Sequence, residues 1–463
     1  MKNSKPLLFL LSLWSILLGT LTACDSFTEI DLPSSQLNAK DVFKDKATAN
    51  AAMADIYTKI REQGLLAGTP LGLSSQLGLY ADELKYYGIS GSIQANFYTN
   101  SLLASDNEIL QLWSNSYNQI YAANAIIEGL ATSDQLETKD KEQLTGEALF
   151  IRGVLHFYLC NVFGGIPYIR TTDYKQNSIV RRMPENEVYQ LIKKDLLQAS
   201  NLIAPQYSTP ERIRVNKWAA QALLARVCLY LKQWEEASDA ASSVLNQSDL
   251  YSWPTDLNDV FLKGSPTTIW QLIPAIDGMN THEAETFIFT QGPPTSLAIS
   301  QELLHAFTSD DLRKTSWLKA VTNGIDTWYH AYKYKEAFNT GTSTEYSIIL
   351  RTAEQYLIRA EARAHQGDLI GAKEDLNKTR NLAGLSNTTA VTVTEIIAAV
   401  LQERRLEFFT ELGHRFFDLK RTGKLDAVLV PVKPQWETTD CLLPIPESEL
   451  LLNPNLAPQN GGY

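Results

Sequence analysis

The strongest constraint on the fold comes from two pairs of short amphipathic segments that align with each other. Apolar residues recur in them every three or four positions, which is typical of helices that bury one face. The pairs span residues 218–231 with 234–245, and 353–366 with 368–382. When the two pairs are aligned, Ala225 matches Ala360 and Ala237 matches Ala372. In each pair the two alanines are twelve residues apart, with the turn between them. Small residues there let antiparallel helices approach closely, so stacked helix pairs are predicted.

Most of the chain before residue 250 also has helical periodicity. Further helices are predicted at residues 41–61, 113–130, 139–163 and 185–203. Between the two helix pairs, residues 267–273 and 328–334 are rich in β-branched and aromatic residues, which favour strands. We therefore expect one mainly α-helical body. Its parts are a helical region at 39–250, an irregular insertion with short strands at 251–350, and a C-terminal region at 351–463.

The first 24 residues indicate an exported lipoprotein. Lys2 and Lys5 precede an apolar run at residues 7–21, and a small residue stands directly before Cys24. The run is short for a membrane span and has the pattern of a signal peptide at residues 1–23. We expect cleavage before Cys24, a lipid on that cysteine, and a polar tether at residues 24–38. The alternative is an ordinary secreted protein whose signal happens to end at a cysteine.

The net charge and the missing motifs argue against nucleic-acid binding and against the common enzyme classes. The chain has 41 lysines and arginines against 52 aspartates and glutamates, a net charge of −11, which argues against nucleic acid as a partner. The sequence contains none of the nucleophile, metalloprotease or phosphate-loop motifs that mark common enzymes. Glu403, Glu407 and Glu411 follow one another at four-residue spacing beside several arginines. We interpret them as structural ion pairs rather than as an acid–base pair, and we expect no enzyme activity, metal or cofactor. Calcium bound by loop carboxylates is the alternative, although no Asp/Asn/Gly loop of the known spacing is present.

Several segments together resemble the SusD/RagB family. They are residues 148–168, 183–199, 218–245, 356–385 and 401–421, and the C-terminal stretch that begins LPIP at Leu443 and ends QNGGY at Tyr463. The sequence ELGHR at 411–415 departs from the Glu-Gly-x-Arg that many members have. The resemblance implies four tetratricopeptide-like helix pairs packed against an irregular part that holds the ligand. It also implies a surface-exposed outer-membrane lipoprotein of Bacteroidetes that binds nutrients without cleaving them and covers, as a hinged lid, a TonB-dependent barrel of the SusC/RagA type.

Two aromatic-rich windows are candidate ligand-binding segments. Sugar rings have flat apolar faces and a hydroxyl rim, so their sites combine aromatic side chains with amides, carboxylates or arginines. The first window, residues 80–98, holds five aromatics in 19 residues. Its candidates are Asp82, Tyr86, Tyr87, Asn96, Phe97 and Tyr98. The second window, residues 280–294, supplies Phe287 and Gln291.

A third aromatic group is interpreted differently. Trp328, His330, Tyr332 and Tyr334 alternate along the second strand-like segment, so they are predicted to form one strand face in the core. For the whole chain we favour a nutrient-binding lid for a SusC-like barrel, with a glycan as ligand rather than a peptide. The alternatives are a RagB-like peptide-binding lid, a structural transporter subunit without a ligand of its own, and a surface hydrolase, which turnover of a polymer would reveal.

Overall fold

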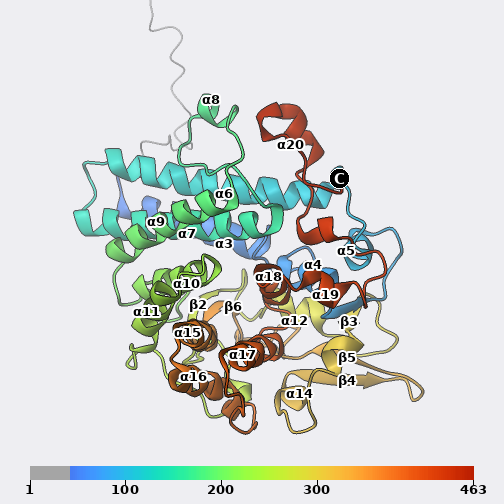
Figure 1. Cartoon of the computed structure of the whole chain (residues 1–463). Coiled ribbons are helices and arrows are strands. Elements are labelled where there is room, and N and C mark those ends of the chain that lie inside the picture. Colours follow the sequence, from blue (N-terminus) through green and yellow to red (C-terminus); the bar gives the residue numbers. More distant parts are fainter. Residues whose placement is uncertain (1–41) are drawn as a thin grey trace, which may run out of the picture. The chain divides into compact units, whose positions relative to one another are not determined.

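A computed structural model describes residues 42–463 of the chain (Figure 1). The expected signal peptide, Cys24 and the tether at 24–38 lie outside the described residues. Eight helices form a stack in which each packs against the next. In chain order they are α6 (Asn107–Thr132), α7 (Thr138–Phe163), α9 (Glu185–Leu202), α10 (Lys217–Tyr230), α11 (Trp234–Leu245), α15 (Thr352–Gln366), α16 (Leu369–Leu382) and α17 (Val393–Glu407). The expected mainly α-helical fold is confirmed.

The two helix pairs found in the sequence, α10 with α11 and α15 with α16, form the middle of this stack, because α11 packs against α15. Their four alanines, Ala225, Ala237, Ala360 and Ala372, are fully buried. The expected close approach of the paired helices is therefore confirmed. Gly367 ends α15 with a φ of +88°, a conformation that favours glycine, and the turn leads directly into α16.

Further helices complete the body. They are α3 (Lys46–Glu62), α4 (Leu73–Tyr80), α5 (Ile93–Thr99), α8 (Tyr174–Asn177), α12 (His282–Phe287), α13 (Gln301–Leu304), α14 (Arg313–Ser316), α18 (His414–Arg421), α19 (Leu425–Leu429) and α20 (Glu447–Leu452). Every residue of α4 is buried, and α4 packs against α5 and α18. The first aromatic window therefore begins at the end of a helix that is buried in the core.

The insertion takes part in three two-stranded antiparallel sheets, one of which it shares with the first aromatic window. Strands β1 (Leu84–Tyr86) and β3 (Leu297–Ile299) form one, β2 (Thr268–Leu272) and β6 (Ser347–Arg351) the second, and β4 (Leu318–Thr322) and β5 (Thr327–Ala331) the third. The strand predicted at 267–273 is found as β2. The one predicted at 328–334 ends at Ala331, because backbone pairing with β4 stops there, so Tyr332 and Tyr334 lie beyond the strand.

The glutamates at the end of α17 belong to a buried ion network. Arg313 donates to Glu403 at 2.6 Å and to Glu407 at 3.0 Å, and Arg351 donates to Glu411 at 2.8 Å. All five side chains are largely shielded from solvent. The interpretation as structural ion pairs is confirmed. However, α17 ends at Glu407, so Glu411 is not on the same helix face and reaches the network from the following turn.

Candidate functional site

The first aromatic window pairs with the segment that directly follows the second window, about two hundred residues later in the sequence. Strand β1 pairs with β3, which places Tyr86 opposite Leu297. The backbone N–H of Tyr87 continues the ladder and donates to the carbonyl of Ser296 at 2.6 Å. Strand β3 also contacts β5, so the β4–β5 hairpin lies beside the joined windows (Figure 1). The first window, the segment after the second window and the hairpin are therefore neighbours in the fold.

Tyr86, Tyr87 and Tyr98 of the first window are half-buried, and neighbouring side chains hold them in place. The hydroxyl of Tyr86 lies 2.7 Å from that of Ser92, and its ring covers Gly88, where a Cβ would lie 2.3 Å from the tyrosine oxygen. Lys85 Nζ lies 5.3 Å from the centre of the Tyr87 ring, and the charge of Lys85 also acts on the hydroxyl of Tyr98. Tyr87, Lys85 and Tyr98 therefore lie close together.

Lys433 fixes the position of Tyr98 through its backbone carbonyl and its ring. Its ammonium group donates to the carbonyl of Leu79 at the end of α4 and to the carbonyl of Tyr98 itself, at 2.5 and 2.9 Å. The same nitrogen lies 4.2 Å from the centre of the Tyr98 ring, within cation–π distance. Burial lowers the pKa of Lys433 to about 7. This lysine joins α4 to α5 and so sets where the Tyr98 ring stands.

Three of the predicted site residues lie in the interior instead. Asp82 is 5% exposed and makes ion pairs of 2.8 Å with Arg405 and Arg415. Burial alone would raise the pKa of Asp82, but the two arginines outweigh it and the pKa is lowered. Phe97 is fully buried against Tyr80, and Phe287 is 5% exposed. These are corrections to the sequence prediction: Asp82, Phe97 and Phe287 hold the site in place from within, and their side chains do not present a surface to a ligand.

The other predicted residues remain accessible. Asn96, like Tyr86, Tyr87 and Tyr98, is half-buried, and Gln291 is exposed. Within residues 42–463, the Gln291 side chain makes no hydrogen bond, which leaves its amide available. The lipid-bearing Cys24 lies outside the described residues.

The hairpin adds two aromatic side chains, one of which, Trp328, is predicted by the alternation along the strand to lie in the core. Trp328 and Tyr329 of β5 are half-buried, whereas His330 is 2% exposed. Trp328 lies against the backbone of Gly292, where a Cβ would come within 2.3 Å of the indole. The dipeptide Asn323-Gly324 between the two strands is a hairpin signal that could have found β4 and hence this surface.

A groove of about 330 Å³ runs between the hairpin and the second window. Phe289 lines it from the loop after α12, and Lys319 and His330 line it from the two strands. The ring centres of Phe289 and His330 are 5.1 Å apart in an edge-to-face arrangement. We call the half-buried aromatic residues of this region, Tyr86, Tyr87, Tyr98, Phe289, Trp328 and Tyr329, the aromatic surface.

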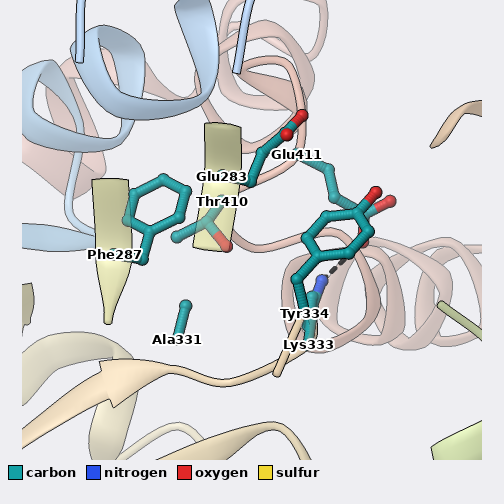
Figure 2. A pocket seen from close by; sticks show the side chains of 7 residues that line it. All are labelled: Glu283, Phe287, Ala331, Lys333, Tyr334, Thr410 and Glu411. Carbon is teal, nitrogen blue, oxygen red and sulfur yellow. Dashed lines mark hydrogen bonds and ion pairs between the residues drawn. The ribbon is translucent and has the colours of Figure 1, made fainter. Parts of the chain in front are cut away.

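A closed pocket beneath the hairpin has a different character (Figure 2). Its volume is about 10 Å³, which is room for about one water molecule. Lys333 points toward Glu411 there and also donates to the carbonyl of Phe409 at 2.8 Å. Burial lowers the pKa of Lys333 to about 8 and raises the pKa of Glu283 on the other wall. The pocket is too small for a sugar ring and belongs to the buried ion network that supports the hairpin.

In this arrangement a mainly helical body presents half-buried aromatic side chains from a loop and a hairpin. Two family models match the chain: one described as "Starch-binding associating with outer membrane" over residues 37–229, and the SusD family over residues 308–430. SusD-like protein P2 of Formosa agariphila is 25% identical over 508 residues, covering 97% of this chain and 98% of that protein. SusD-like protein P38 of the same organism is 24% identical over 494 residues, covering 90% and 92%.

Solved structures show the same fold. A SusD superfamily protein of Bacteroides vulgatus has a TM-score of 0.77 at 21% identity, covering 91% of this chain and 100% of that one. A laminarin-binding SusD-like protein has a TM-score of 0.74 at 23% identity, covering 90% and 99%. The chain belongs to the SusD/RagB family, a carbohydrate-binding family whose members are known as binding proteins rather than enzymes. Lipid anchoring and an outer-membrane location are typical of it. Within residues 42–463, no helix is both long and apolar enough to cross a membrane.

Proposed function

We propose that this chain binds glycans at the cell surface through the aromatic surface and does not cleave them. It is anchored in the outer membrane by a lipid on Cys24 and acts as the lid of a SusC-like TonB-dependent transporter. The observation that carries the proposal is that the first window pairs with the strand just after the second window, while the second window contacts the β4–β5 hairpin, and that their aromatic rings are half-buried.

The chemistry of the aromatic surface suits a sugar chain. The flat C–H face of a pyranose ring packs against an aromatic ring, and its hydroxyl groups need partners that both donate and accept hydrogen bonds. Tyr87, Tyr98 and Trp328 supply the rings, and the amides of Asn96 and Gln291 supply polar groups. The buried arginines, Asp82 and Lys433 hold the backbone of the first window rigid, which lowers the cost of binding.

The transporter role rests on family membership and on the sequence of the N-terminus. A rigid helical stack on a lipid tether moves as one body, as a lid requires. The test is purification from outer membranes in mild detergent with an affinity tag at Tyr463. A stoichiometric large TonB-dependent barrel in the eluate supports the lid, and its absence under conditions that keep other outer-membrane complexes intact contradicts it.

Ligand binding is tested by isothermal titration with the full-length chain carrying Cys24→Ser. Laminarin comes first in the panel, because a laminarin-binding protein shares this fold; starch, mannan, xylan and peptide mixtures follow. We expect saturable binding of a glycan that is lost in the triple variant Tyr86→Ala/Tyr87→Ala/Tyr98→Ala. Asp134→Ala, at an exposed position after α6, is the control. Saturation by peptides alone would move the chain to the peptide-binding branch, and no binding at all would favour a purely structural subunit.

A further inference from the structure

A second hollow lies on the helical side of the molecule, between α6, α8 and α20, at the opposite end of the view from the β4–β5 hairpin (Figure 1). Its volume is about 480 Å³, within the range of pockets that hold small ligands. We call it the helical groove. None of its lining residues belongs to the aromatic surface or to either sequence window, so the helical groove is separate from the proposed glycan site.

Three aromatic side chains one turn apart form the wall that α6 contributes. Trp113, Tyr117 and Tyr121 follow at four-residue spacing and so share one helix face. Trp113 is 3% exposed and lies 4.8 Å, centre to centre, from the Tyr117 ring, whose hydroxyl donates to the carbonyl of Pro167 at 2.9 Å. Tyr121 is 51% exposed. The wall therefore has two fixed rings and one open ring.

The polar groups of the helical groove are mostly neutral. Ser114 and Asn118 lie on the same face of α6 as the aromatic wall, and within residues 42–463 neither side chain makes a hydrogen bond. Asn177, from α8, donates its amide to the carbonyl of Thr171 at 2.8 Å, which leaves its amide oxygen available. Glu449 of α20 is half-buried in the groove, and burial raises its pKa.

These features select among ligand classes. Among the described residues, no lysine or arginine lines the helical groove, so an anion would find no partner there. An extended peptide is recognised mainly through backbone hydrogen bonds, but the lining residues of α6 and α20 have their backbone groups engaged within helices. Hydroxyl groups and side-chain amides both donate and accept, which matches the groups of a neutral sugar.

We propose that the helical groove is a second saccharide site, which takes a neutral, hydroxylated sugar unit against Tyr121 with Ser114 and Asn118 at its rim. This inference rests on the proposed function, since it extends glycan binding to a second place on the chain. A polymer long enough to reach both places binds more tightly than a short fragment, because the second contact is intramolecular. Short oligosaccharides occupy the two places independently.

The test is a titration with the neutral trisaccharides laminaritriose, maltotriose, mannotriose and xylotriose, using the full-length chain carrying Cys24→Ser. We expect two bound molecules per chain for at least one of them. Tyr121→Ala is expected to weaken the groove site by about tenfold or more, because it removes the open ring of the wall. Asn118→Ala, at an exposed position, weakens the same site. Tyr174→Ala on α8, 73% exposed but outside the groove lining, is the matched control and leaves both sites unchanged.

The outcomes separate this inference from the proposed function. One bound molecule that is insensitive to Tyr121→Ala but lost in the aromatic triple variant overturns the second site and leaves the proposed function standing. One bound molecule lost only with Tyr121→Ala supports the helical groove and overturns the aromatic surface. No trisaccharide bound by any form, or saturation of the groove by peptides instead, overturns the second site.

Discussion

Glu83 lies directly between Asp82 and β1, and its burial makes a quantitative prediction. One carboxylate oxygen accepts from the backbone N–H of Thr410 at 3.3 Å, and the other has no hydrogen-bond partner among residues 42–463. Burial, and then the charge of Asp82, raise the pKa of Glu83 to about 8. The folded chain therefore holds a proton on Glu83 between about pH 4.5, where the unfolded chain releases it, and about pH 8.

In that window the folded state binds one proton more than the unfolded state at this residue, so this contribution to stability falls as pH rises. The slope is about 1.4 kcal/mol per pH unit for one proton. Between pH 5.5 and pH 7.5 the loss amounts to about 2 kcal/mol, since the slope decreases as the pH nears the folded-state pKa. Glu83→Gln imitates the protonated acid, keeps an acceptor for Thr410 and removes this dependence.

Urea unfolding at several pH values, followed by tryptophan fluorescence, measures the effect. The quantity of interest is the free energy of unfolding of Glu83→Gln minus that of the wild type, because other buried groups titrate equally in both and cancel. We expect this difference to rise by about 2 kcal/mol from pH 5.5 to pH 7.5. Glu235→Gln, an exposed glutamate on α11, controls for the change of residue. A difference that stays constant over the whole range would refute the reasoning.

Three further predictions concern packing and the aromatic surface. Arg313→Met removes the cation of the buried Asp311 and one of the two cations that pair with Glu403 and with Glu407, and should cost about 3–5 kcal/mol in urea unfolding, whereas a loss below about 1 kcal/mol would show that the network is not stabilising. Ala360→Leu places a larger side chain where α15 meets its neighbours and should cost about 1–3 kcal/mol in the same assay; no loss would contradict the close packing. Gly292→Ala pushes on Trp328 and should weaken glycan binding, while Gly264→Ala, where a Cβ meets nothing within 4 Å, should not; equal affinity of both variants would remove Trp328 from the site.

The helical stack was predictable from the sequence because its cause is local. Periodic apolar residues determine which face of each helix is buried. Gly367 ends α15 because glycine readily adopts the left-handed backbone conformation of a helix C-cap. The predicted helices after residue 100 are found with ends shifted by a few residues. Helix α3, the counterpart of the helix predicted at residues 41–61, begins at Lys46, because Asp45 caps its N-terminus.

The candidate site was predictable only in part, because its geometry depends on contacts between distant segments. The sequence shows that Asp82 is a carboxylate in an aromatic window, but not that Arg405 and Arg415, more than three hundred residues later, would bury it. Phe97 and Tyr98 are neighbours on α5, and the rotation of the helix turns one inward and leaves the other half-buried. Alternation along a strand shows which side chains share a face, but not whether other segments cover that face. The sequence therefore does not show that Trp328 stays half-buried.

The central claim is that the aromatic surface holds a glycan. The most direct measurement is a crystal structure of the chain with the oligosaccharide that binds best in the titrations, collected for the wild type and for the triple variant at Tyr86, Tyr87 and Tyr98. We predict a sugar ring packed against at least one ring of the aromatic surface in the wild type, and no ordered sugar there in the variant. A ligand bound only elsewhere on the chain, or one that keeps its place in the variant, would contradict the account.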